Sequence, residues 1–334
     1  MKKTIYVKLT NNCQLQCKHC YNAFMNNNSD MPRHVLTVVF DQIIQQAQQN
    51  PQIDYDCQLH GGEPLQYKDI DFVIQQLQRT KDYTNMHWCI TTNLVYKLTD
   101  QVYNLFQFMT PFDRNQQFIQ TSWDYKIRFV NDSQLQLWTN NVKTLLSKQI
   151  QVQPTVCLTN QLINEITGKQ LIDYFIELGV THLNFERITN TGRAVQNHLR
   201  PNNKDLDQWL LDAFKYYETV ADKITIQLFV GVFASLQRNF LGCRARHCME
   251  TVTTYNPDGS IGGCPNTAFK PFRNVNGSYN EKVHTIWIKN ENKRDLTCLT
   301  CDYYQYCNGD CFQLQFDDTG CPGMKAIYEY LLSK

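Results

Sequence analysis

Three cysteines near the N-terminus have the spacing that points most directly to chemistry. Cys13, Cys17 and Cys20 lie within eight residues, in the segment CQLQCKHC. Three thiolates can bind three irons of a cubic iron–sulfur cluster and leave the fourth iron without a protein ligand. A catalytic metal centre needs such an open position for its substrate or cofactor. The spacing therefore predicts a metal centre that is open on one side.

The spacing of these cysteines also fits two other kinds of structure. Their i, i+4, i+7 spacing also fits a buried helical stripe, but the segment between them is polar and directly follows a strand-like run, which disfavours a helix. A zinc site that adds His19 as a ligand is the better alternative.

Composition narrows the class of protein. The chain has 334 residues, a formal net charge of +1 and 14 cysteines; no basic stretch suggests nucleic acid as a partner, and no acidic tail suggests a charged partner. The opening MKKTIYVKLTNNC has too short an apolar run for a signal peptide, and no stretch of about 18 apolar residues predicts a membrane span. Dense cysteines in a chain without an export signal usually bind metal. We therefore expect a cytoplasmic metalloprotein.

Short apolar strands alternate with amphipathic helices over the first two thirds of the chain. The predicted strands are Thr4–Leu9, Cys57–His60, Met86–Thr91, Phe118–Trp123, Val152–Leu158, His182–Glu186 and, after a further helix, Ile224–Phe229. The predicted helices are Val35–Gln49, Ile70–Arg79, Asp100–Phe108, Gln134–Leu146, Gly168–Leu178 and Lys204–Val220. Six strand–helix units predict an α/β fold with a parallel sheet that forms a partial, open-sided barrel over residues 1–228. Residues 229–334 are predicted to form a small, irregular α+β domain rich in cysteine.

Polar residues follow the predicted strands at their carboxyl ends, where parallel sheets bind ligands. They are the cysteine loop, then His60-Gly61-Gly62-Glu63-Pro64, Thr91-Thr92-Asn93, Ser122 with Asp124, and Glu186 with Arg187.

CQLQCKHC after the first strand, together with GGEP after the second, resembles the radical S-adenosylmethionine (SAM) enzymes. The resemblance implies that Cys13, Cys17 and Cys20 hold a [4Fe–4S] cluster whose open iron binds SAM. It implies further SAM contacts from His19 near the adenine, the turn Gly61, Gly62, Glu63 and Pro64, the strand ends Thr92, Asn93, Ser122 and Asp124, and Arg187 at the carboxylate. Within this set Glu63 is expected to receive the amino group of SAM. Leu94 stands where the family has a glycine.

A second group of cysteines lies near the C-terminus. They are Cys243, Cys248, Cys264, Cys298, Cys301, Cys307, Cys311 and Cys321. Their spacing resembles the SPASM extension of radical SAM enzymes. The resemblance implies one auxiliary [4Fe–4S] cluster on Cys243, Cys248, Cys264 and Cys311, and another on Cys298, Cys301, Cys307 and Cys321. A zinc ribbon is the alternative for this block taken alone. Cys57, Cys89 and Cys157 lie in apolar strands and are expected to be core residues.

The resemblance implies an enzyme that reductively cleaves SAM to a 5′-deoxyadenosyl radical, which abstracts hydrogen from a peptide or protein. We expect a maturase of ribosomally made peptides that introduces a cross-link or other oxidative modification. The implied partner is an electron donor such as a flavodoxin or ferredoxin. Since the chain starts at the first barrel strand, leader binding is expected to fall to a separate leader-peptide recognition protein or to the barrel surface. No residue is singled out as the catalytic acid or base.

Two other functions are retained as hypotheses. Sulfatase maturation to formylglycine is the second, although that branch expects an aspartate after Cys264 and this chain has Pro265 and Asn266. A non-catalytic iron–sulfur electron carrier is the third, and it would not bind SAM.

Overall fold

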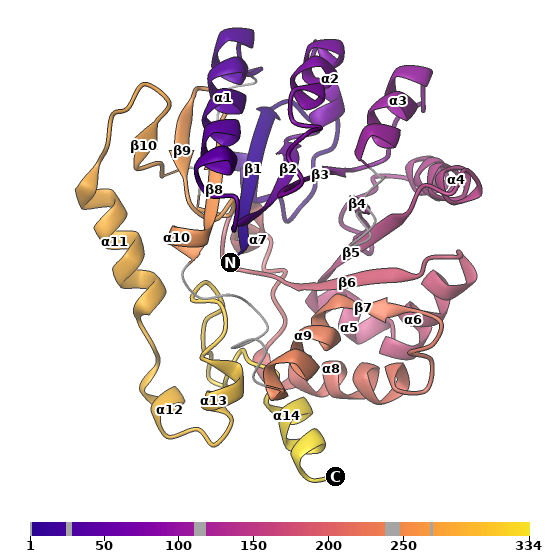
Figure 1. The fold of residues 1–334 in the computed structure, drawn as a ribbon. Coiled ribbons are helices and arrows are strands. Elements are labelled where there is room, and N and C mark those ends of the chain that lie inside the picture. Colours follow the sequence, from indigo (N-terminus) through magenta and orange to yellow (C-terminus); the bar gives the residue numbers. More distant parts are fainter. Residues whose placement is uncertain (1, 25–28, 110–117, 238–247, 268–269) are drawn as a thin grey trace.

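In the computed structural model, ten strands form one sheet (Figure 1). The structure describes residues 2–24, 29–109, 118–237, 248–267 and 270–334. The strands are β1 Lys2–Thr10, β2 Asp54–Gly61, β3 Met86–Thr92, β4 Ile119–Ser122, β5 Val152–Leu158, β6 His182–Arg187, β7 Thr225–Ile226, β8 Val252–Tyr255, β9 Ser260–Gly262 and β10 Arg273–Asn274. Their order is β10-β9-β8-β1-β2-β3-β4-β5-β6-β7. Each strand from β1 to β7 is parallel to the next. Because the end strands β7 and β10 do not pair with each other, this barrel is partial and open.

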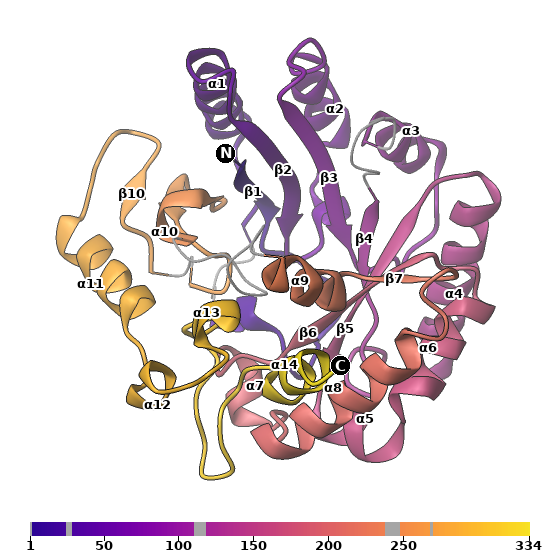
Figure 2. The ribbon, with the colours of Figure 1, turned by 60° about the horizontal axis from the view of Figure 1, so that its bottom comes forward.

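Helices follow the strands and lie outside the curve of the sheet. In Figure 2, α1 to α4 surround the arc of parallel strands. The helices are α1 Arg33–Gln49, α2 Ile70–Gln78, α3 Asp100–Met109, α4 Asp132–Ser147, α5 Asn160–Glu165, α6 Gly168–Glu177, α7 Arg193–Gln196, α8 Asn203–Tyr217 and α9 Gln227–Leu236, with the 3-10 turns η1 Tyr21–Phe24 and η2 Pro64–Gln66. Within the described ranges, no helix combines the length and apolar character needed to cross a bilayer.

The core lies between the strands and these helices, because the strands alternate sides and the helices present apolar faces to them. Val7 and Leu9 of β1, Phe40 of α1 and Trp88 of β3 are buried there, and the last two rings stack at 4.9 Å. Polar side chains also pair between strands. Gln58 of β2 donates to Gln120 of β4 at 2.5 Å and also contacts Thr91 of β3.

The predicted strands and helices through residue 220 are confirmed within one to three residues at their ends. The exception is Ile224–Phe229, where the predicted strand is wrong beyond Ile226. The chain pairs with β6 only at Thr225 and Ile226 and then turns into α9. Leu228, Phe229 and Val232 are buried on one face of that helix, and a short continuous apolar run is compatible with either structure.

The C-terminal part of the chain continues the sheet and then becomes irregular. β8 adds to the free edge of β1 in parallel, and β9 and β10 follow it antiparallel. Short helices come next, namely α10 Cys248–Thr251, α11 Glu281–Asn292, α12 Leu296–Leu299, α13 Tyr304–Cys307 and α14 Lys325–Leu332. The predicted domain division at residue 228 remains a proposal, since α9 packs against β6 and β7 of the barrel.

Candidate functional site

The cysteine loop follows β1 and is held from three sides. Its own turn is closed by the Cys20 amide, which donates to the Cys17 carbonyl at 3.2 Å. The Lys18 amide donates to Ile127, and the Cys20 carbonyl accepts from the Arg193 amide at 3.1 Å. The loop therefore has a fixed backbone that depends on segments more than 100 residues away.

The three thiols of this loop lie close enough for the charge of one to affect the pKa of another. Burial is the main cause that raises the pKa of Cys13 to about 11, and negative charge on Glu63, Cys17 and Cys20 contributes to this increase. The pKa of Cys17 is raised as well, again mainly by burial. Thiols of this kind stay protonated at neutral pH unless a metal binds the thiolates. Cys13, Cys17 and Cys20 therefore fit a metal cluster, because without a bound metal these three thiols would stay protonated.

The GGEP turn packs directly on the cysteine loop. The Gly62 amide donates to the Thr10 carbonyl and the Glu63 amide donates to the Asn12 carbonyl, each at 2.7 Å. A Cβ atom on Gly62 would lie 2.2 Å from the Asn12 oxygen, so no larger residue fits there without moving the loop. Gly61 has a φ of +147°, which L-residues rarely adopt. The two motifs found in the sequence thus form one unit.

Glu63 is a buried carboxylate with several donors. It accepts hydrogen bonds from Thr92 Oγ1 and the Asn93 amide, both at 2.7 Å, and from the Leu65 amide at 3.2 Å. Burial outweighs these donors and raises the pKa of Glu63 to about 7. In the described part of the chain no ion pair forms on Glu63, and Arg128 acts on it only as a minor, more distant charge. A cation bound here would stabilise the ionised form.

The strand end after β3 connects Glu63 to the cysteine loop. Asn93 Nδ2 lies 3.8 Å from Cys13 Sγ, and Gln14 Nε2 donates to Asn93 Oδ1 at 3.1 Å. Leu94 has a φ of +52° and is fully buried, so it keeps the left-handed backbone that usually favours glycine. The substitution noted in the sequence therefore leaves this turn conformation in place.

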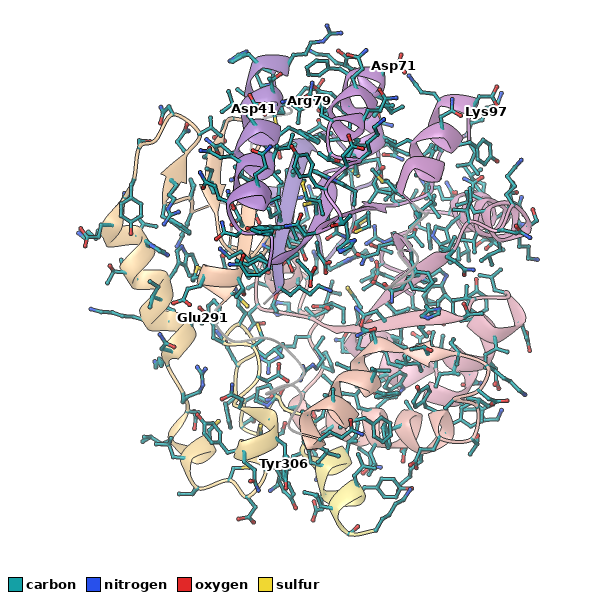
Figure 3. The ribbon with its side chains drawn as sticks, in the orientation of Figure 1. Asp41, Asp71, Arg79, Lys97, Glu291 and Tyr306 are labelled. Carbon is teal, nitrogen blue, oxygen red and sulfur yellow. The ribbon has the colours of Figure 1, made fainter. Side chains whose placement is uncertain are left out.

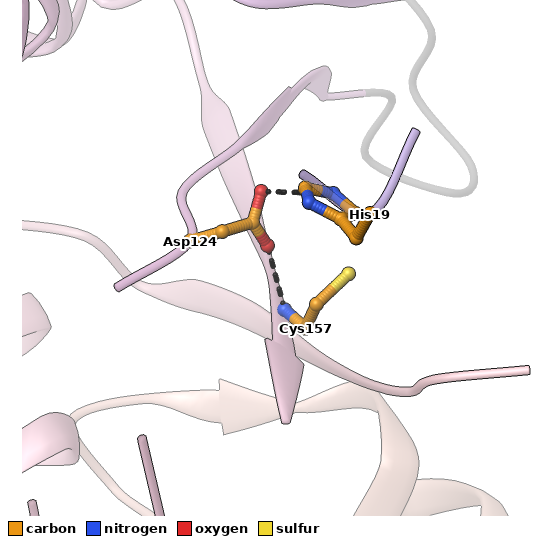
Figure 4. A group of neighbouring side chains, drawn as sticks. All are labelled: His19, Asp124 and Cys157. Atoms are coloured by element: carbon orange, nitrogen blue, oxygen red, sulfur yellow. Dashed lines mark hydrogen bonds and ion pairs between the residues drawn. The ribbon is translucent and has the colours of Figure 1, made fainter. Parts of the chain in front are cut away.

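His19 and Asp124 meet beside the cysteine loop (Figure 4). His19 Nε2 lies 3.3 Å from Asp124 Oδ2, and the Cys157 amide donates to Asp124 Oδ1 at 2.9 Å. His19, Asp124 and Cys157 are close enough to hold a metal ion, but the guanidinium of Arg128 already binds Asp124 at 2.5 Å and lies 3.3 Å from His19. A fixed cation in the group disfavours a second cation there.

His19 has one ring nitrogen satisfied and one that is not. Its Nε2 has both Asp124 and Arg128 within reach, so either tautomer finds a partner there. Its buried Nδ1 has no hydrogen-bond partner in the described part of the protein. A buried nitrogen without a partner is costly, so a ligand at this position would be expected to complete it.

Asp124 stays ionised through Arg128. Burial alone would raise the pKa of Asp124, but Arg128, His19 and the Cys157 amide hold it below the ordinary value. Arg128 was missed in the sequence, although its place four residues after Asp124 in TSWDYKIR is a usable signal. Ser122 ends β4 two residues before Asp124 and is half-buried.

Arg187 lies at the end of β6 and binds the C-terminal region. Its Nη2 pairs with Asp310 Oδ2 at 2.6 Å, and its Nη1 donates to the Pro322 carbonyl at 2.9 Å, with both side chains buried. These contacts connect the barrel to the residues beside Cys311 and Cys321. Its predicted role at the carboxylate of SAM remains a prediction.

Four C-terminal cysteines line a cavity of about 550 Å³. They are Cys298, Cys301, Cys307 and Cys321. A Cβ atom on Gly323 would lie 3.2 Å from Cys321 Sγ and 3.3 Å from Cys307 Sγ, so this glycine leaves the space beside both sulfurs open. The same four cysteines make up one of the two predicted auxiliary sets, and the cavity fits a metal cluster.

The other predicted set lies near α10. Burial is the main cause that raises the pKa of Cys248, and charges on Cys264 and Cys311 add to it, which places these three thiols near one another. Cys243 lies outside the described residues. Glu291 of α11, labelled in Figure 3, is buried and accepts from the amides of Cys248 and, at 3.2 Å, Met249. This carboxylate holds the start of α10 in place.

Comparisons with known proteins agree with this arrangement. Residues 7–107 match the family model described as the Radical SAM superfamily, and no curated protein matches the sequence. Native anSMEcpe with bound AdoMet has a TM-score of 0.77 at 15% identity, over 99% of this chain and 97% of that one. Native anSMEcpe with AdoMet and the Cp18Cys peptide has a TM-score of 0.76 at 14% identity, and the match covers 100% of this chain and 97% of that one. Streptococcus suis SuiB bound to its precursor peptide SuiA has a TM-score of 0.63 at 15% identity, and the match covers 96% of this chain and 76% of that one. These similarities show a common fold.

Proposed function

We propose that this protein is a radical SAM/SPASM enzyme that modifies a peptide, because residues 7–107 match the radical SAM family model. One observation carries the proposal: the GGEP turn is hydrogen-bonded to the loop that bears the three cysteines. Glu63, a buried carboxylate without an ion pair among the described residues, therefore lies beside the loop of the three cysteines. An open iron and an adjacent anion together suit a cofactor with a metal-binding amino acid group.

The cysteines would hold three [4Fe–4S] clusters. Cys13, Cys17 and Cys20 would hold the one that binds SAM, and the two C-terminal sets would hold the auxiliary clusters. Bound at these residues, the clusters and SAM would supply an electron and a 5′-deoxyadenosyl group able to abstract hydrogen. The chain's own part is to bind, orient and shield them, and the auxiliary sites would accept or relay electrons.

The SAM contacts are proposed on the residues around that loop. Glu63 would accept a hydrogen bond from the amino group, and this bond would favour the ionised carboxylate and lower the raised pKa of Glu63. The free Nδ1 of His19 would accept a hydrogen bond from the adenine. The remaining contacts are proposed for Gly61, Gly62, Pro64, Thr92, Asn93, Ser122, Asp124 and Arg187.

A ribosomally made peptide is the proposed substrate. Peptides are bound in the structures of both anSMEcpe and SuiB, which have this fold, and this supports a peptide partner. Pro265 and Asn266 stand after Cys264 where a sulfatase maturase would have an aspartate, so peptide maturation is favoured over formylglycine formation. Sulfatase maturation is kept as the second candidate, because the match to anSMEcpe covers 99% of this chain and 97% of that one. The proposed electron donor is a flavodoxin or ferredoxin of the cytoplasm, and a separate leader-binding protein is a further proposed partner.

Anaerobic reconstitution with iron, sulfide, dithionite and SAM tests the proposal. We expect release of 5′-deoxyadenosine from the wild-type protein. Changing Cys13, Cys17 and Cys20 together to Ala should abolish release while about eight irons remain in two auxiliary cubes. Cys57→Ala is the matched control, since Cys57 is a buried strand residue that is assigned no metal.

Intact clusters without 5′-deoxyadenosine release would instead support the electron-carrier hypothesis. Bound zinc in place of iron would contradict both. Among peptide candidates, a hydrazide probe for aldehydes separates formylglycine from a cross-link, because a cross-link and a serine-derived formylglycine both lose two hydrogens.

A further inference from the structure

Lys8 is a buried cation near the carboxyl end of β1, and its side chain points to two loops. It is 1% exposed. Its ammonium donates to Asn22 Oδ1 at 2.9 Å and contacts the Pro265 carbonyl at 3.5 Å, and it lies 5.4 Å from the centre of the Tyr21 ring. Asn22 follows Cys20 by two residues, and Pro265 follows Cys264 directly. The ammonium therefore lies between two groups of cysteines.

The partners of Lys8 are neutral. Its contacts are an amide oxygen, a carbonyl oxygen and an aromatic ring, and no Asp or Glu of the described ranges pairs with it. His60, its neighbour on β2, is held neutral because burial lowers the pKa of that ring to about 3. A buried ammonium without an anion is expensive.

The acidic groups that act on the Lys8 ammonium are two cysteine thiols. Burial lowers the pKa of Lys8 to about 8, while charge on Cys264 and then Cys20 acts in the opposite direction. Cys264 belongs to the set proposed for the first auxiliary cluster and Cys20 to the SAM-binding set. An iron–sulfur cluster on four thiolates is a buried anion, and nearby charge is one of the factors that set its reduction potential.

We propose that Lys8 is the buried counter-ion of the first auxiliary cluster and, more weakly, of the SAM-binding cluster, and that it raises their reduction potentials. This inference rests on the proposed function, which supplies the clusters. A positive charge favours the reduced cluster because that form carries one more negative charge. The same cation lies where an electron would pass between the two sites, so it would also favour electron acceptance by the auxiliary site.

Redox titration of the loaded protein under anaerobic conditions, followed by EPR, tests the inference. Lys8→Met should lower the midpoint potential of the first auxiliary cluster. The expected change is roughly tenfold in the ratio of oxidised to reduced cluster at a fixed potential, which is 59 mV for one electron. The second auxiliary cluster should not shift. Lys8→Arg keeps the positive charge, so its midpoint potential should stay close to that of wild type. If Lys8→Met does not fold, Lys8→Gln also removes the charge and should lower the midpoint potential in the same way.

Lys2→Met is the matched control, because Lys2 lies at the other end of β1 and is exposed beside Asp56. It should leave every potential unchanged. Thermal unfolding before and after iron loading adds a second readout. Before loading, Lys8→Met should melt higher than wild type, since it removes an uncompensated charge, and loading should reduce or reverse that difference.

Unchanged potentials in a loaded Lys8→Met protein that still releases 5′-deoxyadenosine would overturn the role of Lys8 and leave the proposed function standing. A lower melting temperature both before and after loading, without a shift in potential, would show a structural role only. A wild-type protein that binds no auxiliary cluster would overturn both proposals, because the anion would not exist.

Discussion

Replacing Arg128 by Met should destabilise the protein strongly. Asp124 is fully buried, and the Arg128 side chain that pairs with it at 2.5 Å is 12% exposed. Removing one partner of a buried ion pair typically costs about 3–5 kcal/mol, because the other charge is left without compensation. Asp124 would keep the Cys157 amide and His19, so we expect about 3 kcal/mol, at the lower end of this range. Denaturant unfolding of the loaded protein under anaerobic conditions measures it.

Lys126→Met is the matched control two residues away. Its pair with Glu165 is exposed on both sides, so its loss should be unmeasurable. The double variant Asp124→Asn/Arg128→Met should lose less stability than the sum of its single variants, because neither charge remains. A loss below about 1 kcal/mol for Arg128→Met, close to that of a surface pair, would refute the reasoning.

The pH dependence of the Arg128 effect has a defined sign. Because the pKa of Asp124 is held below the ordinary value of 3.8, the stability from this pair is present above about pH 4 and is lost as the pH falls through the lower folded-state pKa. In Arg128→Met the buried carboxyl of Asp124 would have a raised pKa, so the difference in unfolding free energy between wild type and this variant should begin to shrink above pH 4 and continue to shrink down to the lower folded-state pKa of wild type. A difference that grows on acidification would contradict this account.

Three further predictions concern the loops and the C-terminal helix. Gly62→Ala should reduce 5′-deoxyadenosine release by about 100-fold or more, because its Cβ would overlap the Asn12 carbonyl and displace the cysteine loop, and a 1 Å misplacement has such an effect; wild-type turnover would refute it. Gly323→Ala should lower the iron content by about four per chain, since its Cβ would crowd the sulfurs of Cys307 and Cys321, and full iron loading would refute this role of Gly323. Burial raises the pKa of Asp207 to about 6, so its contribution to stability is present below about pH 4 and falls as the pH rises through 6. Asp207→Asn should flatten the dependence of the melting temperature on pH between pH 4 and 6, and an unchanged slope would place the titration elsewhere.

The regular part of the fold could be predicted because hydrophobic periodicity encodes it directly. Val152–Leu158 was predicted at its observed limits, since a strand buried on one side alternates every second residue. The predicted strand Ile224–Phe229 was wrong beyond Ile226 because a short apolar run is compatible with a strand or a helix, and the helical form of α9 is selected by packing on β6 and β7. The addition of β8 to β1 joins residues about 250 positions apart, which no local pattern specifies.

The candidate site divides in the same way. The cysteine loop and GGEP could be found because their chemistry depends on fixed spacing in the chain. The ion pair of Arg187 with Asp310 depends on the tertiary fold, so the sequence suggested a ligand contact for Arg187 and gave no hint of its partner. Lys8 had one local signal, a lysine within the apolar strand IYVKLT, but its position between Asn22 and Pro265 required the structure.

The EPR spectrum of the reduced, iron-loaded protein before and after addition of SAM tests the central claim most directly. If the loop of Cys13, Cys17 and Cys20 holds a cube with an open iron beside Glu63, SAM must change the signal of one cluster and leave the auxiliary signals as they were. A variant without these three cysteines should show no change. A wild-type spectrum that SAM does not alter, or a protein that binds only zinc, would contradict the account.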